Sequence, residues 1–185
     1  AFNAMRPAAL SALQAGGGAQ LPARGSENYE RTDLRAMYAP DLGVNINRVA
    51  IPVDVAATFH CDVPNLSTLL GIVVNDAFVP SSTLVSNLPE GVLFCSLRKA
   101  AQEHPALVES HYGALAPLGN PAVALNTLLA QDGVMIYVPD GVTVEKPLQL
   151  VNIFHSPTPL MAARRVLVVL GKGAKAQILV CDHTQ

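Results

Sequence analysis

The chain has 185 residues, of which 50% are hydrophobic and 14% are charged, and its formal net charge is −2 at pH 7. This composition excludes an intrinsically disordered chain, which combines low hydrophobicity with high charge. It also excludes the strongly basic face that nucleic-acid binding requires, so nucleic acid is not an expected partner.

The cysteines and the apolar runs indicate the cellular compartment. No apolar run reaches the roughly 18 residues of a membrane-spanning helix, and the first residues lack the cationic start and apolar core of a signal peptide. Three cysteines, Cys61, Cys95 and Cys181, make an odd number without CxxC spacing. We therefore expect no membrane partner and no disulfide framework, and a reducing cytoplasm fits best.

The N-terminal half mixes a helix with short strands. Good helix formers predict a helix over residues 8–15, which the glycines at 16–18 end. Ser26 is a candidate cap for a short turn over residues 27–30. Short strands are predicted at residues 45–51, 69–74 and 92–95, with a turn and extended chain over 75–80.

Three helices are predicted next, each from a local start signal. Ser96 is a cap for residues 97–104, and Pro105 opens a helix that runs through Tyr112. Asn120 and Pro121 predict a third helix that ends near Ala130.

From Asp132 onward the pattern changes to strands. Short β-branched runs lie at residues 134–138, 142–144, 148–154, 166–170 and 176–181, separated by Pro- and Gly-containing turns. No helix-length pattern lies between them, which disfavours a βαβ sheet. A sandwich, a barrel or a solenoid all fit. The absence of an Asn-Gly or Asp-Gly hairpin between matched strands favours the solenoid.

Two Cys/His clusters are the candidates for metal binding. His60-Cys61-Asp62 and Cys181-Asp182-His183 each combine thiolate and imidazole ligands. Cys181 and His183 would share one face of a strand, because side chains alternate with period two. Neither cluster has a second cysteine pair nearby, so no metal ligand is assigned.

Other polar groups favour structural interpretations. The Gly171–Lys175 cluster lacks phosphate-loop spacing and is expected to be an exposed turn. His155-Ser156 has no G-x-S-x-G context, so no catalytic residue is assigned. The acids Asp132, Asp140, Glu145 and Asp182 are expected to be solvated turn residues rather than a catalytic pair. Arg164-Arg165, near Met161, is expected to be the solvated start of a strand rather than an anion site.

Several segments together resemble the SufB/SufD family. Residues 125–127, 132–142 and 145–150 are similar to the region where that family's core begins, and residues 165–171 and 174–183 follow in the family's order. Residues 27–34 are similar to a motif near the family's N-terminus, with Tyr29 where Trp is usual and Arg31 where Tyr is usual. Residues 74–79 and 88–92 are similar to the stretch that precedes the family's helices. The SufD branch fits better than the SufB branch.

The resemblance implies an α+β N-terminal domain over residues 1–131, followed over 132–185 by the first rungs of a right-handed parallel β-helix (β-solenoid). It implies a non-catalytic scaffold in the SUF iron–sulfur cluster assembly machinery, with a SufB-like paralogue and a SufC-like ATPase as partners. It implies that this fragment binds no cofactor, that the full complex handles the cluster, and that the cluster-handling residues lie beyond Gln185.

Two further expectations concern the strand-rich half. A solenoid that ends within its rungs leaves an edge of unpaired backbone groups, which favours continuation of the chain or a homodimer through that edge. The alternative functions are a β-solenoid enzyme that acts on a polysaccharide or a small acyl acceptor, and a purely structural interaction module.

Overall fold

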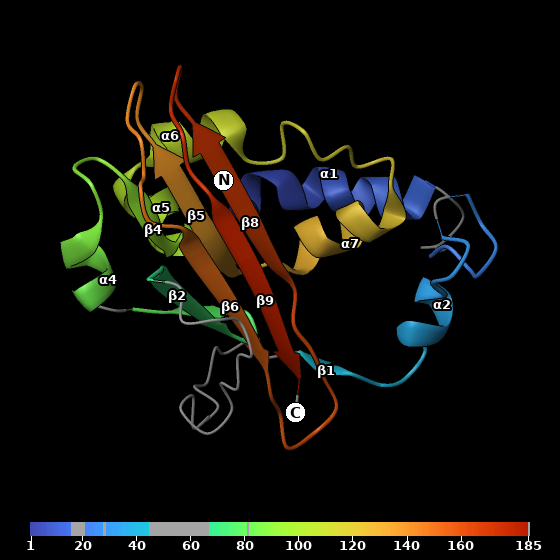
Figure 1. Cartoon of the computed structure of the whole chain (residues 1–185). Helices are drawn as coiled ribbons and strands as arrows, with labels where there is room; N and C mark the ends of the chain where they lie inside the picture. The colour runs from blue at the N-terminus through green and yellow to red at the C-terminus, as the bar shows by residue number, and fades with distance from the viewer. Residues whose placement is uncertain (16–20, 28, 45–66, 81, 185) are drawn as a thin grey trace.

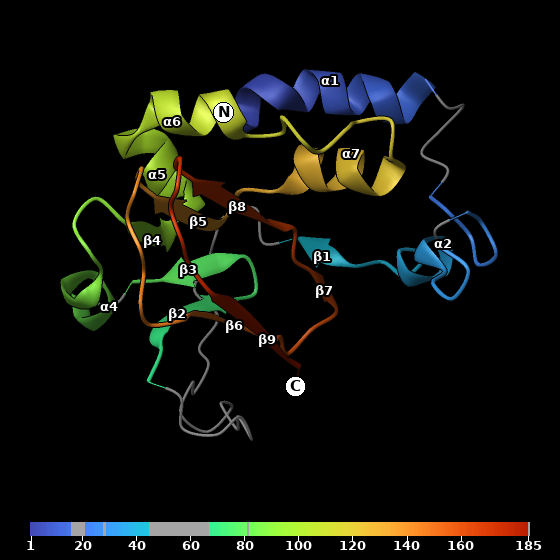
Figure 2. The same cartoon turned by 45° about the horizontal axis from the view of Figure 1, so that its top comes forward.

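The computed structural model describes the chain apart from residues 16–20, 28, 45–66, 81 and 185 (Figure 1). The helices α1 (Phe2–Ala15), α5 (Leu97–Glu103), α6 (Pro105–His111) and α7 (Pro121–Leu129) lie together on one side of the strands (Figure 2). Two shorter helices are α2 (Leu34–Met37) and α4 (Ser82–Asn87). Within the described part of the chain, no helix is both long and apolar enough to cross a membrane.

The predicted starts of α5, α6 and α7 are confirmed. Ser96 Oγ accepts a hydrogen bond from Lys99 N at 3.1 Å at the start of α5. Pro105 lies in the first turn of α6, and Asn120 Oδ1 accepts from Ala122 N at 2.9 Å at the start of α7. The backbone N–H groups in the first turn of a helix have no acceptor inside the helix. Ser96 and Asn120 supply an acceptor oxygen, and Pro105 has no N–H to satisfy, which is why local sequence predicts where these helices begin.

The first helix is longer than predicted. α1 begins at Phe2 rather than at residue 8, and it contains Pro7. Proline lacks an N–H and crowds the preceding turn, so local sequence argues against helix there. Packing outweighs this cost, since Leu13 is buried and the centroids of the Phe2 and Tyr112 rings are 4.9 Å apart. The predicted start at residue 8 was therefore wrong.

The turn predicted near Ser26 forms differently from the expected cap. Tyr29 N donates to Ser26 O at 2.8 Å, so the chain does turn there. The Ser26 hydroxyl, however, donates to Ala23 O at 2.7 Å, the residue three positions before it.

Most strands lie in two sheets. One sheet has the order β3 (Ala77–Val79), β2 (Leu69–Val74), β6 (Leu148–Phe154), β9 (Ile178–Thr184). The other has the order β4 (Leu93–Ser96), β5 (Asp132–Val138), β8 (Arg164–Leu170). The short strands β1 (Gly43–Val44) and β7 (Leu160–Met161) pair with each other.

The strand predictions are confirmed in most places. β2 has the predicted bounds, and β4, β5, β6, β8 and β9 each overlap a predicted run. The strand predicted over 142–144 is wrong, because only Thr143 forms a bridge, to Lys175. β7 was not predicted, and the predicted strand at 45–51 lies outside the described residues.

Apart from the short β7, the strands of residues 132–184 alternate between these two sheets. β5 pairs with β8 in parallel, with Asp132 opposite Arg164, and β6 pairs with β9 in parallel, with Leu148 opposite Ile178. No helix lies between these strands in residues 132–184, so a βαβ connection is absent from this described segment, as predicted.

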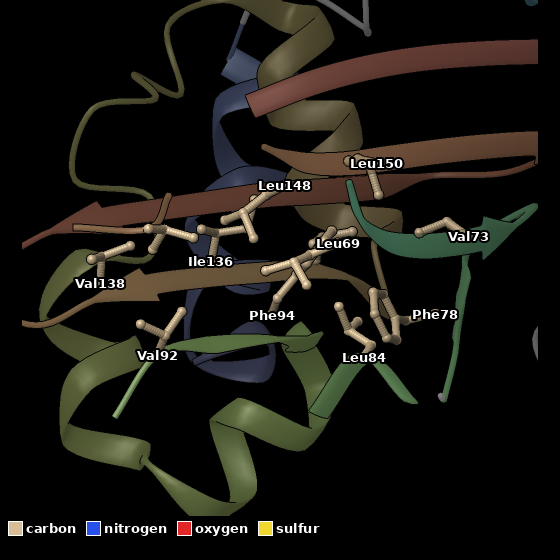
Figure 3. Packing of buried hydrophobic residues seen from close by; sticks show 12 residues of the cluster. Leu69, Val73, Phe78, Leu84, Val92, Phe94, Ile136, Val138, Leu148 and Leu150 are labelled. Carbon is tan, nitrogen blue, oxygen red and sulfur yellow. The ribbon is translucent and has the colours of Figure 1, made fainter. Parts of the chain in front are cut away.

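The core lies between the two sheets and takes residues from both sides of position 131. Phe94 of β4 and Leu69 of β2 pack with Ile136 of β5 and Leu148 of β6, as Figure 3 shows. β2 pairs with β6 in parallel and β4 pairs with β5 antiparallel, so both sheets continue across residue 131. The division into residues 1–131 and 132–185 stays a prediction.

The core is open at one end. Within the described chain, β8 and β9 each have a strand neighbour on one side. Val168 lies opposite the fully buried Ile136, and Val180 lies opposite the fully buried Leu150, yet Val168 is 41% exposed and Val180 is 54% exposed. They belong to an apolar end face, which we define as Val166, Val168, Leu170, Ile178 and Val180.

Candidate functional site

Cys181 and His183 lie on one face of β9, as predicted, because β9 spans Ile178–Thr184 as a strand. Gln149 Nε2 donates to Cys181 Sγ at 3.6 Å. The Thr68 hydroxyl in turn donates to Gln149 Oε1 at 2.7 Å. The Cys181 sulfur therefore ends a hydrogen-bonded row that crosses β6 from the start of β2.

The two residues do not complete a metal site among the described side chains. No group of three or more His, Cys, Asp or Glu residues there is arranged to hold a metal ion. A structural zinc site uses four such ligands, and a catalytic one uses three with a water molecule. The other candidate, His60-Cys61-Asp62, lies outside the described residues.

Asp182 and Arg164 link the two sheets beside the apolar end face. Arg164 Nη2 lies 3.5 Å from Asp182 Oδ1, and Arg164 Nη1 donates to Asn75 O at 2.9 Å. Burial lowers the pKa of Arg164, whereas the charges of Asp182 and Asp76 act to raise it. Because the Asp182 side chain is 72% exposed, we expect the pair to contribute at most about 1 kcal/mol.

Arg165 faces the helices on the other side of β8. Its Nη2 donates to Asn126 Oδ1 at 3.0 Å and to Thr127 Oγ1 at 2.7 Å. The prediction that Arg164 and Arg165 begin a strand is confirmed. The predicted solvation is wrong, because both guanidinium groups are part-buried and bound to the protein.

The Gly171–Lys175 cluster is a turn between β8 and β9, as predicted. Ala174 N donates to Gly171 O at 3.1 Å, and Gly173 has a φ of +72°. Asp140 Oδ1 accepts from Lys172 N at 2.8 Å, so this turn rests on the turn that follows β5. The next element is a strand, whereas a phosphate loop precedes a helix.

His155 and Ser156 hold the chain after β6. Asn75 and His155 exchange two hydrogen bonds, since His155 N donates to Asn75 Oδ1 at 3.0 Å and Asn75 Nδ2 donates to His155 O at 2.9 Å. Ser156 Oγ accepts from Thr158 N at 3.3 Å. This serine hydroxyl is engaged in a local turn, which gives no support for a serine nucleophile.

The carboxylates have separate structural roles. Asp132 is 4% exposed, and its Oδ1 accepts from Ser96 Oγ at 2.8 Å and from Arg98 N at 3.0 Å. The prediction of a solvated acid was therefore wrong for Asp132, which ties β5 to the start of α5. Asp140 supports a turn, Asp182 pairs with Arg164, and Glu145 is exposed. Sugar cleavage would require two carboxylates on either side of one bond.

An apolar cavity of about 430 Å³ lies beside β4. Phe78, Leu84, Phe94 and Cys95 contribute to its lining, with Lys99 at the same cavity. Burial raises the pKa of the Cys95 thiol to about 11, although Lys99 acts to lower it. The thiol therefore stays protonated at neutral pH, which makes Cys95 a poor nucleophile and a poor metal ligand.

Comparisons with known proteins identify the family of this chain. The family model of the SufBD protein N-terminal region matches residues 1–150. The chain belongs to the SufBD family. A protein of Synechocystis sp. described as an iron-sulfur cluster assembly SufBD family protein is 32% identical over 117 residues, which cover 62% of this chain and 24% of that protein.

Two further SufBD relatives extend the comparison. A second Synechocystis protein of the same description is 25% identical over 163 residues, 88% of this chain and 35% of that protein. A Mycobacterium bovis protein of that description is 36% identical over 87 residues, 46% of this chain and 10% of that protein. The chain thus spans between 10% and 35% of the length of these SufBD relatives.

Proposed function

We propose that this chain is the N-terminal part of a SufD-like scaffold for iron–sulfur cluster assembly, with no catalytic activity of its own. The family match over residues 1–150 carries the proposal, and the relatives described as iron-sulfur cluster assembly proteins support it. A non-catalytic role also fits Asp132 and Asp140, whose carboxylates accept backbone hydrogen bonds that hold a helix and a turn.

The strand-rich half is proposed to form the first rungs of a right-handed parallel β-helix, with the division from the N-terminal domain near residue 131. The alternation of β5, β6, β8 and β9 between two sheets supports this, because successive turns of a solenoid stack each strand on its predecessor. The parallel bridge from Thr143 to Lys175 extends the same stacking through the connection.

The apolar end face is proposed to be covered in the complete protein. Its five aliphatic side chains continue columns that are fully buried one strand earlier, as Val168 continues from Ile136. Burying such side chains contributes about 1.5–3 kcal/mol each, and free strand edges promote aggregation. Either further strands of the same protein or a second copy would supply the cover.

The proposed partners are a SufB-like paralogue and a SufC-like ATPase in the cytoplasm, and the complex as a whole handles the iron–sulfur cluster. The test is to purify the tagged complete protein from its host without oxygen and to identify co-purifying proteins by mass spectrometry. An equally tagged, unrelated cytoplasmic protein is the control. We expect both partners in stoichiometric amounts in the first sample and neither in the control.

Two results would contradict this function. One is recovery of the complete, folded protein without either partner. The other is turnover of a polysaccharide or an acyl acceptor by the purified protein at a rate above that of buffer, which would favour the solenoid enzyme instead.

A further inference from the structure

Arg165 is the centre of a polar cluster between β8 and the helices. Its Nε and Nη2 both donate to Asn126 Oδ1, at 3.2 and 3.0 Å, and Nη2 also donates to Thr127 Oγ1 at 2.7 Å. The guanidinium carbon lies 5.1 Å from the centroid of the Tyr112 ring. Arg165 therefore joins the last turns of α7 to the end of α6.

A second arginine reaches the same place from α1. Arg6 Nη2 donates to Ala130 O at 3.1 Å, at the C-terminal end of α7, and Arg6 Nη1 donates to Asn3 Oδ1 at 2.8 Å. Figure 2 shows α1 and α7 side by side above β8, and these two helices are in extensive contact. Burial raises the pKa of Tyr112, and the charges of Arg165 and Arg6 act to lower it.

Three hydrogen-bond donors in this cluster lack an acceptor. Arg6 Nε, Tyr112 Oη and Arg165 Nη1 are buried and make no hydrogen bond within the described chain, and Tyr112 as a whole is 5% exposed. Buried donors are almost always paired, and each unpaired one destabilises the structure. All three are O–H or N–H groups, so what would satisfy them is an acceptor.

The charges also lack compensation. Among the described residues, neither Arg6 nor Arg165 forms an ion pair with a carboxylate. The C-terminal end of α7 offers the equivalent of about half a negative charge, which is less than the two positive charges nearby. The interpretation that these arginines only cap α7 accounts for the bonds to Ala130 and Asn126, but it leaves the three donors unexplained.

We propose that Arg6, Tyr112 and Arg165 form a binding site for a small oxyanion, of the phosphate or carboxylate class. Guanidinium groups bind such anions through two parallel hydrogen bonds, and a phenol O–H adds a third donor. The three donor atoms are shielded from water. This site is independent of the proposed scaffold function and of the β-helix.

The test is a titration of the complete protein with sodium phosphate and, separately, with sodium acetate, against sodium chloride at the same ionic strength. Thermal unfolding is the readout. We expect a saturable rise in Tm with at least one of the two oxyanions, and the one that acts identifies the class. Arg165→Gln and Arg6→Gln should each weaken the apparent affinity at least tenfold.

Two further variants make the result specific. Tyr112→Phe keeps the ring beneath Arg165 and removes only the unpaired hydroxyl, so it should fold and bind several-fold more weakly. Arg98→Gln changes an exposed arginine outside the cluster and should bind like the unmodified protein. The proposal is overturned by a Tm that follows ionic strength alone in both oxyanions, or by an unchanged affinity in Arg165→Gln and Tyr112→Phe.

Discussion

Replacing Gly133 with alanine is the most direct test of how closely β5 and β8 stack. Gly133 lies opposite Arg165 and has a φ of +153°. An added Cβ would lie 2.7 Å from Arg165 N, 2.8 Å from its carbonyl carbon and closer still to its carbonyl oxygen. These are backbone atoms, so no side-chain rotation relieves the overlap and the two strands must separate locally.

The expected loss of stability follows from that separation. Breaking about two ladder hydrogen bonds costs about 1 kcal/mol each. A non-glycine residue at this φ adds about 1–3 kcal/mol of strain, and alanine returns about 0.4–1 kcal/mol through the unfolded chain. The free energy of unfolding of Gly133→Ala should therefore fall by about 3 kcal/mol, measured by urea denaturation of the complete protein.

Two other glycines separate overlap from backbone strain. Gly141 has a φ of +73° but open space around its added Cβ, so Gly141→Ala should lose only about 1 kcal/mol. Gly119 also has open space and no such φ, and Gly119→Ala should stay within about 0.5 kcal/mol of the unmodified protein. The stacking of β5 on β8 is refuted if Gly133→Ala loses no more stability than Gly141→Ala.

Three further changes test other parts of the structure. Asp132→Ala should lower the free energy of unfolding by about 2–3 kcal/mol because Arg98 N loses its acceptor. Asp132→Asn keeps an acceptor oxygen and should cost about 1 kcal/mol. Equal losses of the two variants in urea denaturation would contradict the role of Asp132 as the acceptor for α5. The pKa of Cys95, raised from 9.0 to about 11, predicts slow alkylation at pH 8. Because the folded pKa exceeds the unfolded one, its contribution to stability is present below pH 9 and is lost as the pH rises toward 11, a decline that Cys95→Ala should lack. Val168→Lys should destabilise the complete protein by about 2 kcal/mol if the apolar end face is covered, while Val85→Lys, at a residue that is 65% exposed, should have little effect. Equal small effects of the two variants would show that the face is uncovered. A molar mass of Val168→Lys that is half that of the unmodified protein would identify a second copy as the cover.

Local signals in the sequence were sufficient for the helix starts after residue 95. Ser96 and Asn120 cap α5 and α7 through hydrogen bonds to residues two or three positions ahead, so the information lies within one turn. The start of α1 depends instead on packing of Phe2 against Tyr112, far away in the sequence. Propensity alone gave the wrong start because Pro7 dominates the local pattern.

The candidate sites show the same division between local and distant information. The shared face of Cys181 and His183 follows from strand periodicity and was predictable. The arginine cluster was not, because strand alternation sends Arg164 toward Asp182 and Arg165 toward the helices. Its other cation, Arg6, comes from the first helix, and no spacing rule links it to Arg165.

Three similar turns indicate where the stacking begins. In the turns at residues 89–92, 139–142 and 171–174, the fourth N–H donates to the first carbonyl at 3.1–3.2 Å. The third residue of each turn is a glycine. Gly91, Gly141 and Gly173 have φ values of +76°, +73° and +72°. Such turns require a positive φ at this position, which glycine adopts most readily.

These turns lie on one another. A Cβ at Gly91 would lie 3.0 Å from Pro139 Cγ, and Asp140 accepts from Lys172 N in the next turn. The first of the three turns precedes residue 131, and β2 also lies parallel on β6. The stacked arrangement therefore begins before the predicted boundary, and what changes near residue 131 is the direction of the neighbouring strand, since β4 is antiparallel to β5 and β8 is parallel to it. The proposed β-helix would thus grow from a layer that the N-terminal residues themselves supply.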